Sequence, residues 1–324
     1  MNTATKLGAY ALGLAAVFGG ALGAGNVTGP VGAAPETESH GHGEQGGHGE
    51  QGGHGGHAAG AGTPGGLQVS EDGYTLAPRR TTVEAGEKTD FSFTINGPDG
   101  EPVTGFEPLH GKRLHLIVAR RDLSGFQHLH PTLANGVWTV PLTLKDAGVY
   151  RFFTDFKPTG AKRQYTLGAD VTVPGDLRPA PLPEPEQVAK VDGYEVRLTG
   201  GLVPGESSEL TLSVRKDGEP VGDLQPYLEA YGHLVALRAG DLAYLHVHPD
   251  GEPGDGKTKP GPDITFFAEA PSAGAYRLYL DFKHGGKVRT AEFTVHAGHA
   301  ALPEDEPAGP HEDGEPGDGH GHTH

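Results

Sequence analysis

The sequence lacks cysteine and holds a single methionine, and both absences exclude classes of site. With no cysteine among 324 residues, disulfides, thiolate zinc sites, iron–sulfur clusters and cysteine nucleophiles are excluded. The only methionine is Met1, which excludes a methionine-rich Cu(I) site. Positive charge is also scarce, because 25 Lys and Arg stand against 42 Asp and Glu. The resulting net charge of −17 argues against nucleic acid or an anionic membrane surface as a partner.

Apolar residues are few, whereas glycine, proline and histidine are abundant. Hydrophobic residues make 35% of the chain, while 54 Gly and 27 Pro together make about a quarter of it. Such a composition cannot be spread evenly over packed domains, so part of the chain is expected to be tail or linker. The 19 histidines make the charge strongly pH-dependent, since their full protonation would change −17 to about +2.

The N-terminal region, residues 1–35, contains a long uncharged stretch. Residues 7–25 (LGAYALGLAAVFGGALGAG) carry no charge and are long enough to cross a bilayer as a helix. The same stretch also fits a cleaved signal peptide, and a buried core helix is a third alternative. The first two interpretations predict an extracytoplasmic protein, either membrane-anchored by an N-terminal helix or secreted, which would contact the membrane through this segment only.

Two segments of low complexity flank the remainder of the chain. Residues 36–66 are rich in Gly, His and Glu and contain the repeat HGEQGG, and residues 298–324 hold further histidines among Gly, Pro and acidic residues. Both are predicted to be disordered. They are either a solvated linker and tail or segments whose imidazoles gather around metal ions, with carboxylates as further ligands.

An internal duplication lies between these segments. Residues 99–131 align without a gap on residues 217–249, and the similarity extends on both sides. We therefore expect repeat one over residues 67–176 and repeat two over residues 187–297. The Pro-rich residues 177–186 form a stiff linker between them.

Each repeat is predicted to be an all-β, Ig-like β-sandwich, because short strand patterns alternate with turn signals. Tyr150 follows the D-x-G-x-Y spacing typical of an immunoglobulin-type tyrosine corner, and Tyr276 occupies the same place in repeat two. The predicted strands of repeat one cover residues 73–83, 89–96, 113–120, 126–130, 136–144, 149–156 and 164–173.

The duplicated spacing brings histidines together on one sheet of each repeat. A two-residue turn at 239–240 pairs His233 with His246, and the same spacing in repeat one pairs His115 with His128. The third histidine of each set lies two residues further on and therefore shares the same strand face. An aspartate at the end of a neighbouring strand completes each set. The predicted metal ligands are His115, His128, His130 and Asp155 in repeat one, and His233, His246, His248 and Asp281 in repeat two.

Imidazoles with one carboxylate and no sulfur suit divalent transition metals, with Cu(II) favoured over Zn(II) on affinity. A complete set of four ligands favours binding over catalysis. Alternatively, the histidines with Ile117, Phe126 and Phe153 form a half-apolar outer face that the two repeats bury against each other. Both interpretations hold if the sites lie between the repeats. The aspartates have an alternative as solvated charges, His110 is expected on the surface, and His284 is a candidate additional ligand.

Two blocks carry a resemblance to known proteins, LHLIVARRDLSGFQHLHP (residues 114–131) and AGVYRFFTDFKP (residues 147–158). Tandem sandwiches with extracytoplasmic histidines resemble bacterial envelope proteins of the CopC-like and YtkA-like kind. The blocks themselves are similar to uncharacterised secreted or membrane-anchored proteins described as heavy-metal-binding. The resemblance covers both repeats and implies an Ig-like fold and, through the CopC-like proteins, copper binding. The chain departs from CopC-like proteins in lacking a methionine-rich Cu(I) segment.

No sequence motif of an enzyme is present: there is no G-x-S-x-G elbow, phosphate loop, dinucleotide fingerprint or HExxH. We therefore expect a non-enzymatic protein that binds Cu or Zn and buffers or delivers it. Its expected partners are metal ions and an envelope metal transporter or metalloprotein. The alternative is an envelope interaction or adhesion module in which the sandwich histidines serve packing or pH response.

Overall fold

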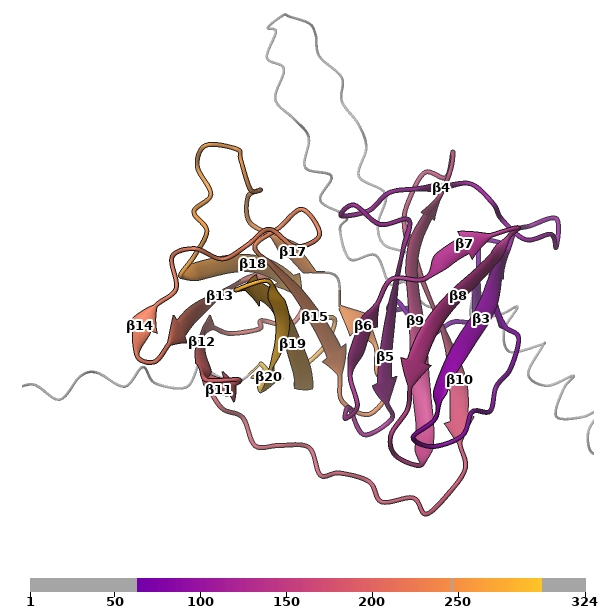
Figure 1. The fold of residues 1–324 in the computed structure, drawn as a ribbon, viewed down its shortest axis with the longest axis horizontal. Coiled ribbons are helices and arrows are strands. Elements are labelled where there is room, and N and C mark those ends of the chain that lie inside the picture. Colours follow the sequence, from indigo (N-terminus) through magenta and orange to yellow (C-terminus); the bar gives the residue numbers. More distant parts are fainter. Residues whose placement is uncertain (1–62, 246, 299–324) are drawn as a thin grey trace, which may run out of the picture. The chain divides into compact units, whose positions relative to one another are not determined.

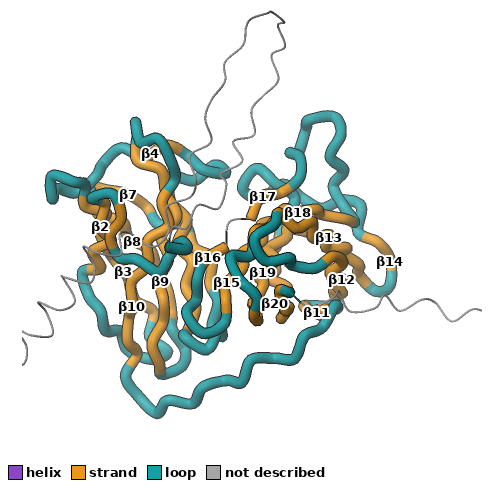
Figure 2. Tube along the Cα trace, turned by 180° about the vertical axis from the view of Figure 1, so that it is seen from behind, coloured by secondary structure: helices purple, strands orange, loops and turns teal. Residues whose placement is uncertain are grey.

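Buried and exposed side chains alternate along the strands of the computed structural model, which describes residues 63–245 and 247–298. In repeat one, Phe91, Phe93 and Ile95 are buried at every second position of one strand. Successive side chains of a strand point to opposite faces, so this pattern gives each strand one face toward a core. All regular elements in the described ranges are strands (Figure 2). Accordingly, no helix within them is long and apolar enough to span a membrane.

Repeat one folds into two sheets, drawn from indigo to magenta in Figure 1. Its strands are β1 (Ser70–Glu71), β2 (Tyr74–Pro78), β3 (Lys88–Asn96), β4 (Phe106–Glu107), β5 (Leu114–Arg120), β6 (Gln127–Leu129), β7 (Thr132–Ala134), β8 (Val137–Thr143), β9 (Gly148–Pro158) and β10 (Tyr165–Val173). One sheet has the order β1-β2-β3-β8-β7, and the other has the order β10-β9-β5-β6, with β4 paired to β9.

Repeat two has the same topology in its main strands and differs in the short strand that lies off each sheet path. Its strands are β11 (Val188–Val191), β12 (Tyr194–Gly200), β13 (Ser207–Lys216), β14 (Glu219–Pro220), β15 (Gly232–Arg238), β16 (Tyr244–Leu245), β17 (Val247–Pro249), β18 (Asp263–Glu269), β19 (Gly274–His284) and β20 (Lys287–Ala297). Its sheets run β11-β12-β13-β18-β17 and β16-β15-β19-β20, with β14 beside β13. The strand order of each sheet thus matches that of repeat one.

Each repeat has its own apolar core between its two sheets. In repeat one, Phe91 and Trp138 from one sheet are buried in the same cluster as Phe152 from the other. In repeat two, Leu212 and Phe282 come from opposite sheets and are likewise buried together. The prediction of an all-β, sandwich-type fold is therefore confirmed.

The predicted strands of repeat one all correspond to observed strands, with three short additions, β1, β4 and β7. The strand predicted over residues 73–83 ends earlier, at Pro78. The tyrosine spacing also forms its expected hydrogen bonds: the Tyr150 hydroxyl donates to the carbonyl oxygen of Asp146 at 3.0 Å. The Tyr276 hydroxyl donates to that of Ser272 at 2.7 Å.

A third apolar cluster joins the two repeats, which belong to one compact unit. Its fully buried members include Ile117 and Phe153 from repeat one and Tyr279 from repeat two. The ring of Phe126 stacks on that of Tyr279 with centroids 4.0 Å apart, and the Tyr279 hydroxyl donates to the Leu123 carbonyl oxygen at 2.5 Å. The interpretation in which the repeats bury outer sheet faces against each other is therefore correct.

The residues Gly65–Gly66, which we call the strap, bridge both repeats. The Tyr244 amide donates to the Gly65 carbonyl oxygen at 2.9 Å, and the Gly66 amide donates to the Thr166 carbonyl oxygen at 2.7 Å. Glycine is required at position 66, where φ is +75° and a Cβ would lie 2.4 Å from the Phe153 ring. The prediction of disorder over 36–66 is therefore wrong for these last residues. The remainder of that segment, the N-terminal segment and residues 299–324 lie outside the described residues.

Candidate metal site between the repeats

The hairpin that carries the histidines of repeat one has a register two residues away from the predicted one. His128 lies opposite Ile117 instead of opposite His115. The corresponding hairpin of repeat two is displaced in the same way, with Leu245 opposite Ala236. Because the displacement is an even number of residues, every side chain stays on its predicted face.

The turns explain this displacement. Each contains a buried leucine with a left-handed backbone, Leu123 (φ 67°) and Leu242 (φ 62°), and both side chains belong to the cluster between the repeats. An aspartate stabilises each turn by accepting a backbone hydrogen bond two residues on, from Ser124 to Asp122 and from Ala243 to Asp241. The predicted two-residue turns, at 121–122 and 239–240, do not include these leucines, so the observed turns are longer.

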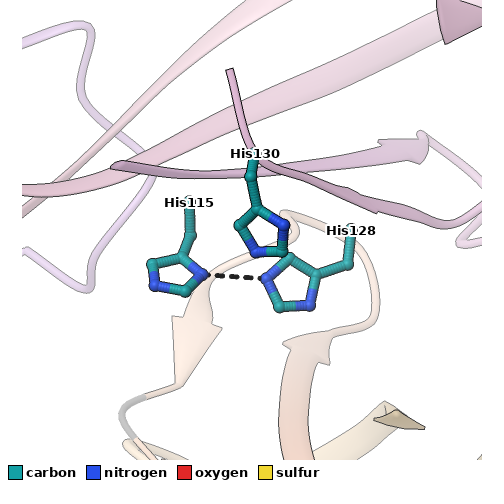
Figure 3. Close-up of side chains that lie close together, drawn as sticks. All are labelled: His115, His128 and His130. Carbon is teal, nitrogen blue, oxygen red and sulfur yellow. Dashed lines mark hydrogen bonds between the residues drawn. The ribbon is translucent and has the colours of Figure 1, made fainter. Parts of the chain in front are cut away.

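Three of the predicted ligands form a compact cluster, which we call the triad: His115 on β5, His128 on β6 and His130 directly after β6 (Figure 3). One ligand nitrogen from each ring lies within 4.8 Å of the other two. His115 Nδ1 and His128 Nε2 are 3.0 Å apart. The ligand nitrogens of a tetrahedral zinc ion are ~3.3 Å apart, so small ring rotations fit the triad to an ion.

The other nitrogens of His115 and His128 are held by hydrogen-bond acceptors. His115 Nε2 donates to the Leu109 carbonyl oxygen at 2.9 Å. His128 Nδ1 pairs with Asp281 Oδ2 at 2.8 Å, and the Thr290 hydroxyl donates to Asp281 Oδ1 at 2.6 Å. Metal-binding histidines typically have such partners, which fix the tautomer and orientation of the ring.

The hydrogens in the row of hydrogen bonds from Leu109 through His115 and His128 to Asp281 indicate where a cation fits. The Leu109 carbonyl can only accept, so a neutral His115 has its lone pair at Nδ1 and His128 donates to it from Nε2. A second hydrogen is then needed between His128 and Asp281. The three hydrogen bonds can form together only with one proton more than two neutral rings and a carboxylate supply. A cation between His115 and His128 replaces that proton and leaves the outer bonds intact.

His130 supplies the orphaned atom of the site. Its Nε2 is buried and has no hydrogen-bond partner. Buried polar atoms of this kind are uncommon in folded proteins and call for an explanation such as an ion or a bound water. A lone pair directed at the neighbouring rings is the donor that a divalent transition metal requires, so the residues present fit such an ion.

Burial keeps the imidazoles of His115, His130 and His233 neutral. It lowers the pKa of His115 to about 2, of His130 to about 3 and of His233 to about 4, and the neighbouring His128 adds to each of these shifts. Neutral imidazole is the form that binds metal. Burial also raises the pKa of the Asp155 carboxyl to about 6.

The second predicted set does not form an independent site within the described residues. His233 Nε2 donates to the carbonyl oxygens of Tyr227 and Leu228. Its ring lies beside the triad, 6.4 Å from that of His115, and outside the cluster of ligand atoms. His248 is exposed on β17, which pairs with β18 of the opposite sheet; it lines the cavity beside the triad but is not a member of the triad cluster. The predicted ligand His246 lies outside the described residues.

The two aspartates differ in their surroundings. Asp155 lies opposite His115 in the sheet, as predicted, but its Oδ1 accepts hydrogen bonds from Gln164 and Thr166, and it is not a member of the triad cluster. Asp281 is 3% exposed, so its interpretation as a solvated charge is wrong. Its carboxylate hydrogen-bonds to His128 of repeat one, whereas the prediction grouped Asp281 with the histidines of repeat two.

Several supporting groups escaped the sequence prediction. Thr290 and Thr166 lie opposite Asp281 and Asp155 in the sheets, so the duplication itself contained their signal. The carbonyl acceptors Leu109 and Tyr227 also occupy matching positions, but a backbone role leaves no mark in the sequence.

The suggestion that His284 is a further ligand is wrong. It hydrogen-bonds Tyr194 at 2.6 Å and pairs with Asp223 at 3.0 Å. His284 and Asp281 are three residues apart on β19, and residues at an odd spacing point to opposite faces of a strand. The His284 ring therefore points away from the face that carries the triad's acceptor.

A family model described as Domain of unknown function (DUF8832) matches residues 68–173 and 189–299. The chain belongs to this family. The two DUF8832 segments fall on the two repeats and cover about two thirds of the sequence. No curated protein matches the chain.

Solved structures similar to this DUF8832 protein share low identity with it. A Salmonella alpha-2-macroglobulin mutant is 12% identical over 72% of this chain and 15% of that one, with a TM-score of 0.25. The Escherichia coli adhesin FdeC is 15% identical over 71% and 65%, with a TM-score of 0.22. Domains 5–6 of the S-layer protein SbsC are 15% identical over 69% and 98%, with a TM-score of 0.21. The chain thus spans a small part of the macroglobulin.

Proposed function

We propose that this protein binds one divalent transition-metal ion at the triad and buffers or delivers it, without catalysis. His115, His128 and His130 are the ligands, and Asp281 with the Leu109 carbonyl orients two of them. The site is shared between the repeats, because the ligands come from repeat one and the supporting carboxylate from repeat two. The proposal replaces two predicted sites by one.

The buried, unpartnered Nε2 of His130 is the observation that carries the proposal. A purely structural histidine cluster would leave this atom unsatisfied at a cost of about 1–3 kcal/mol. An ion that also contacts His115 Nδ1 and His128 Nε2 satisfies it, and the metal favours neutral imidazoles of the kind that burial produces here.

The donor set favours Cu(II) over Zn(II) on intrinsic affinity, since the ligands are three imidazole nitrogens. A binding role is favoured over catalysis by the small space beside the triad. The adjoining cavity has a volume of about 70 Å³, which holds a few water-sized groups and leaves little room for a substrate.

The cellular setting belongs to the same proposal. The uncharged stretch at residues 7–25 supports an extracytoplasmic protein, anchored by an N-terminal helix or secreted. The hydrogen bonds of Tyr150 and Tyr276 support an Ig-like form of the sandwich and the resemblance to CopC-like and YtkA-like proteins. An envelope transporter or metalloprotein is the proposed acceptor, and the histidines of both terminal segments are low-affinity collectors.

A second candidate is an envelope interaction module in which the histidines hold the repeats together. It is favoured by the hydrogen bond between His128 and Asp281, which joins the repeats without any ion. The stacked pair of Phe126 and Tyr279 adds to the same interface. In this function the imidazoles of the triad serve packing.

Thermal unfolding of the full chain with and without metal separates the two candidates. Only metal bound to the folded state raises the unfolding temperature, so an ion bound at the triad stabilises the protein. We expect Zn(II) or Cu(II) to raise the unfolding temperature of the wild type and to have no such effect on His130→Gln. An unchanged unfolding temperature in the wild type would favour the interaction module.

A further inference from the structure

Two of the three triad ligands are difficult to reach from solvent. His115 is 5% exposed, and the side chain of His128 is 5% exposed. A hydrated divalent ion binds there only after losing waters, and each lost water needs a protein donor in its place. The residues between solvent and the triad therefore decide how fast an ion is exchanged.

A cavity of about 70 Å³ adjoins the triad. His115 and His128 of the triad line it, together with Asp155 and the histidines His110, His233 and His248. This volume is sufficient for a partly hydrated ion, because a cavity of only ~10–15 Å³ holds one water molecule. The cavity thus connects triad residues with three further imidazoles, of which His110 and His233 have ring centroids within 6.4 Å of that of His115.

Among the histidines that line the cavity, His110 is exposed. It lies in a turn with a left-handed backbone (φ 46°), closed by hydrogen bonds between Leu109 and Lys112. The neighbouring Leu109 carbonyl fixes His115, so one turn holds the triad ligand and presents His110 beside it. His110 is an exposed residue, and its ring centroid lies 5.3 Å from that of His233 and 6.3 Å from that of His115.

His233 lies between His110 and the triad. Its ring centroid is 6.4 Å from that of His115 and 6.3 Å from that of His128. Since its Nε2 donates to the carbonyls of Tyr227 and Leu228, the lone pair of the neutral ring is at Nδ1. The duplication has diverged here, because Leu228 stands where repeat one has His110.

We propose that His110 and His233 form an outer pair of imidazole ligands through which a divalent metal ion is exchanged between solvent and the triad. The inference rests on the proposed function and names the residues that control its kinetics. Two imidazoles bind more weakly than three, so the ion moves on to the triad. The outer pair changes the rates of loading and release by the same factor and leaves the equilibrium affinity unchanged.

The test measures Cu(II) loading of the full chain by stopped flow and its release to excess chelator. The phase that is absent in His130→Ala reports the triad. His110→Asn removes the imidazole and keeps a residue that tolerates the left-handed turn. His296→Asn is the matched control, since His296 is also exposed but lies on β20 outside the residues that line the cavity.

We expect His110→Asn, and also His233→Ala, to slow both triad phases about tenfold with the dissociation constant within about twofold of wild type. His296→Asn should match wild type. The proposal is overturned if the phases of His110→Asn equal those of wild type, or if its affinity falls while its loading rate is unchanged. A wild type without any phase that depends on His130 would instead overturn the proposed function.

Discussion

Single side chains decide where the lone pairs of the triad point. The Leu109 carbonyl and the Asp281 carboxylate occupy the outer nitrogens of His115 and His128, so the inner nitrogens are left for a cation. Asp155 is the duplicated counterpart of Asp281, but its Oδ1 is engaged by Gln164 and Thr166. The same residue type therefore supports a ligand in one repeat and closes a local network in the other.

Substituting the two aspartates separates these roles. Asp281→Asn removes the charged acceptor of His128 and should weaken metal affinity about 10–100-fold, the usual effect of losing such a partner. Asp155→Asn is the matched control and should change the affinity much less. Competition titration against a chelator of known affinity measures both. Equal losses in the two variants would contradict the assignment of Asp281.

Metal binding should release a proton. The hydrogen bonds from Leu109 to Asp281 need one proton more than neutral rings and a carboxylate supply, and a cation between His115 and His128 would displace it. Calorimetric titrations at pH 7 in buffers of different ionisation heat should report about one proton released per ion. A heat independent of the buffer would show that this proton is absent.

The metal-free protein should lose stability in acid. A histidine whose pKa is lower in the folded state takes up its proton more readily in the unfolded state. The free energy of unfolding therefore falls as the pH drops below about 6.5. His115, His130 and His233 act in this direction, with folded pKa values of about 2, 3 and 4. Asp155, raised to about 6, acts oppositely, because its folded form takes up a proton first. Together these shifts lower the free energy of unfolding by about 4 kcal/mol between pH 7 and pH 5.

Urea unfolding with chelator present, at pH 7 and pH 5, measures this loss. His130→Gln removes one of the three buried imidazoles and should show a smaller dependence on pH. The expectation fails if the unfolding midpoint of the wild type is unchanged or higher at pH 5.

Among the elements, the strands were predictable and the turns were not. Alternating apolar residues and the duplicated spacing located β5, β6 and β9 and placed His115 opposite Asp155. The hairpin register depends on a buried leucine with positive φ in each turn, and nothing local in the sequence marks it. The faces were nevertheless correct, since the shift is an even number of residues.

The strap is an ordered segment that the Gly-rich composition predicts to be disordered. Gly65 and Gly66 look like the end of a Gly-rich tail, yet they hydrogen-bond to Thr166 and Tyr244 in different repeats. Their fit depends on the absence of side chains, because a Cβ at Gly66 would lie 2.4 Å from Phe153. Tertiary contact therefore overrides the disorder that the composition predicts.

Two glycines with nearly the same backbone test the strap. Gly86 has φ +74° and open space around it, whereas Gly66 has φ +75° and contacts Phe153. Gly86→Ala should cost about 1 kcal/mol from backbone strain alone. Gly66→Ala should cost about 1–3 kcal/mol more because of the added contact, as measured by urea unfolding. Equal costs would show that the strap does not restrain the fold.

At the scale of the whole molecule, the described residues bring together only one of the two predicted sets of histidines. The repeats share a topology, but they face each other through a common apolar cluster, and the triad of one repeat uses the carboxylate of the other. Sequence alignment treats the repeats as independent and therefore predicts two sites. How the outer faces meet depends on long-range packing of Ile117, Phe153 and Tyr279, whose partners lie in the other repeat.

The stoichiometry of metal binding tests this account most directly. Calorimetric titration of Cu(II) or Zn(II) into a shortened chain, residues 63–298, removes the histidines of both terminal segments. We predict one equivalent bound with high affinity, lost in His115→Ala combined with His130→Ala. The full chain carrying these two substitutions should keep only weak binding by its terminal segments. Two equivalents in the shortened chain, or none, would contradict a single site shared between the repeats.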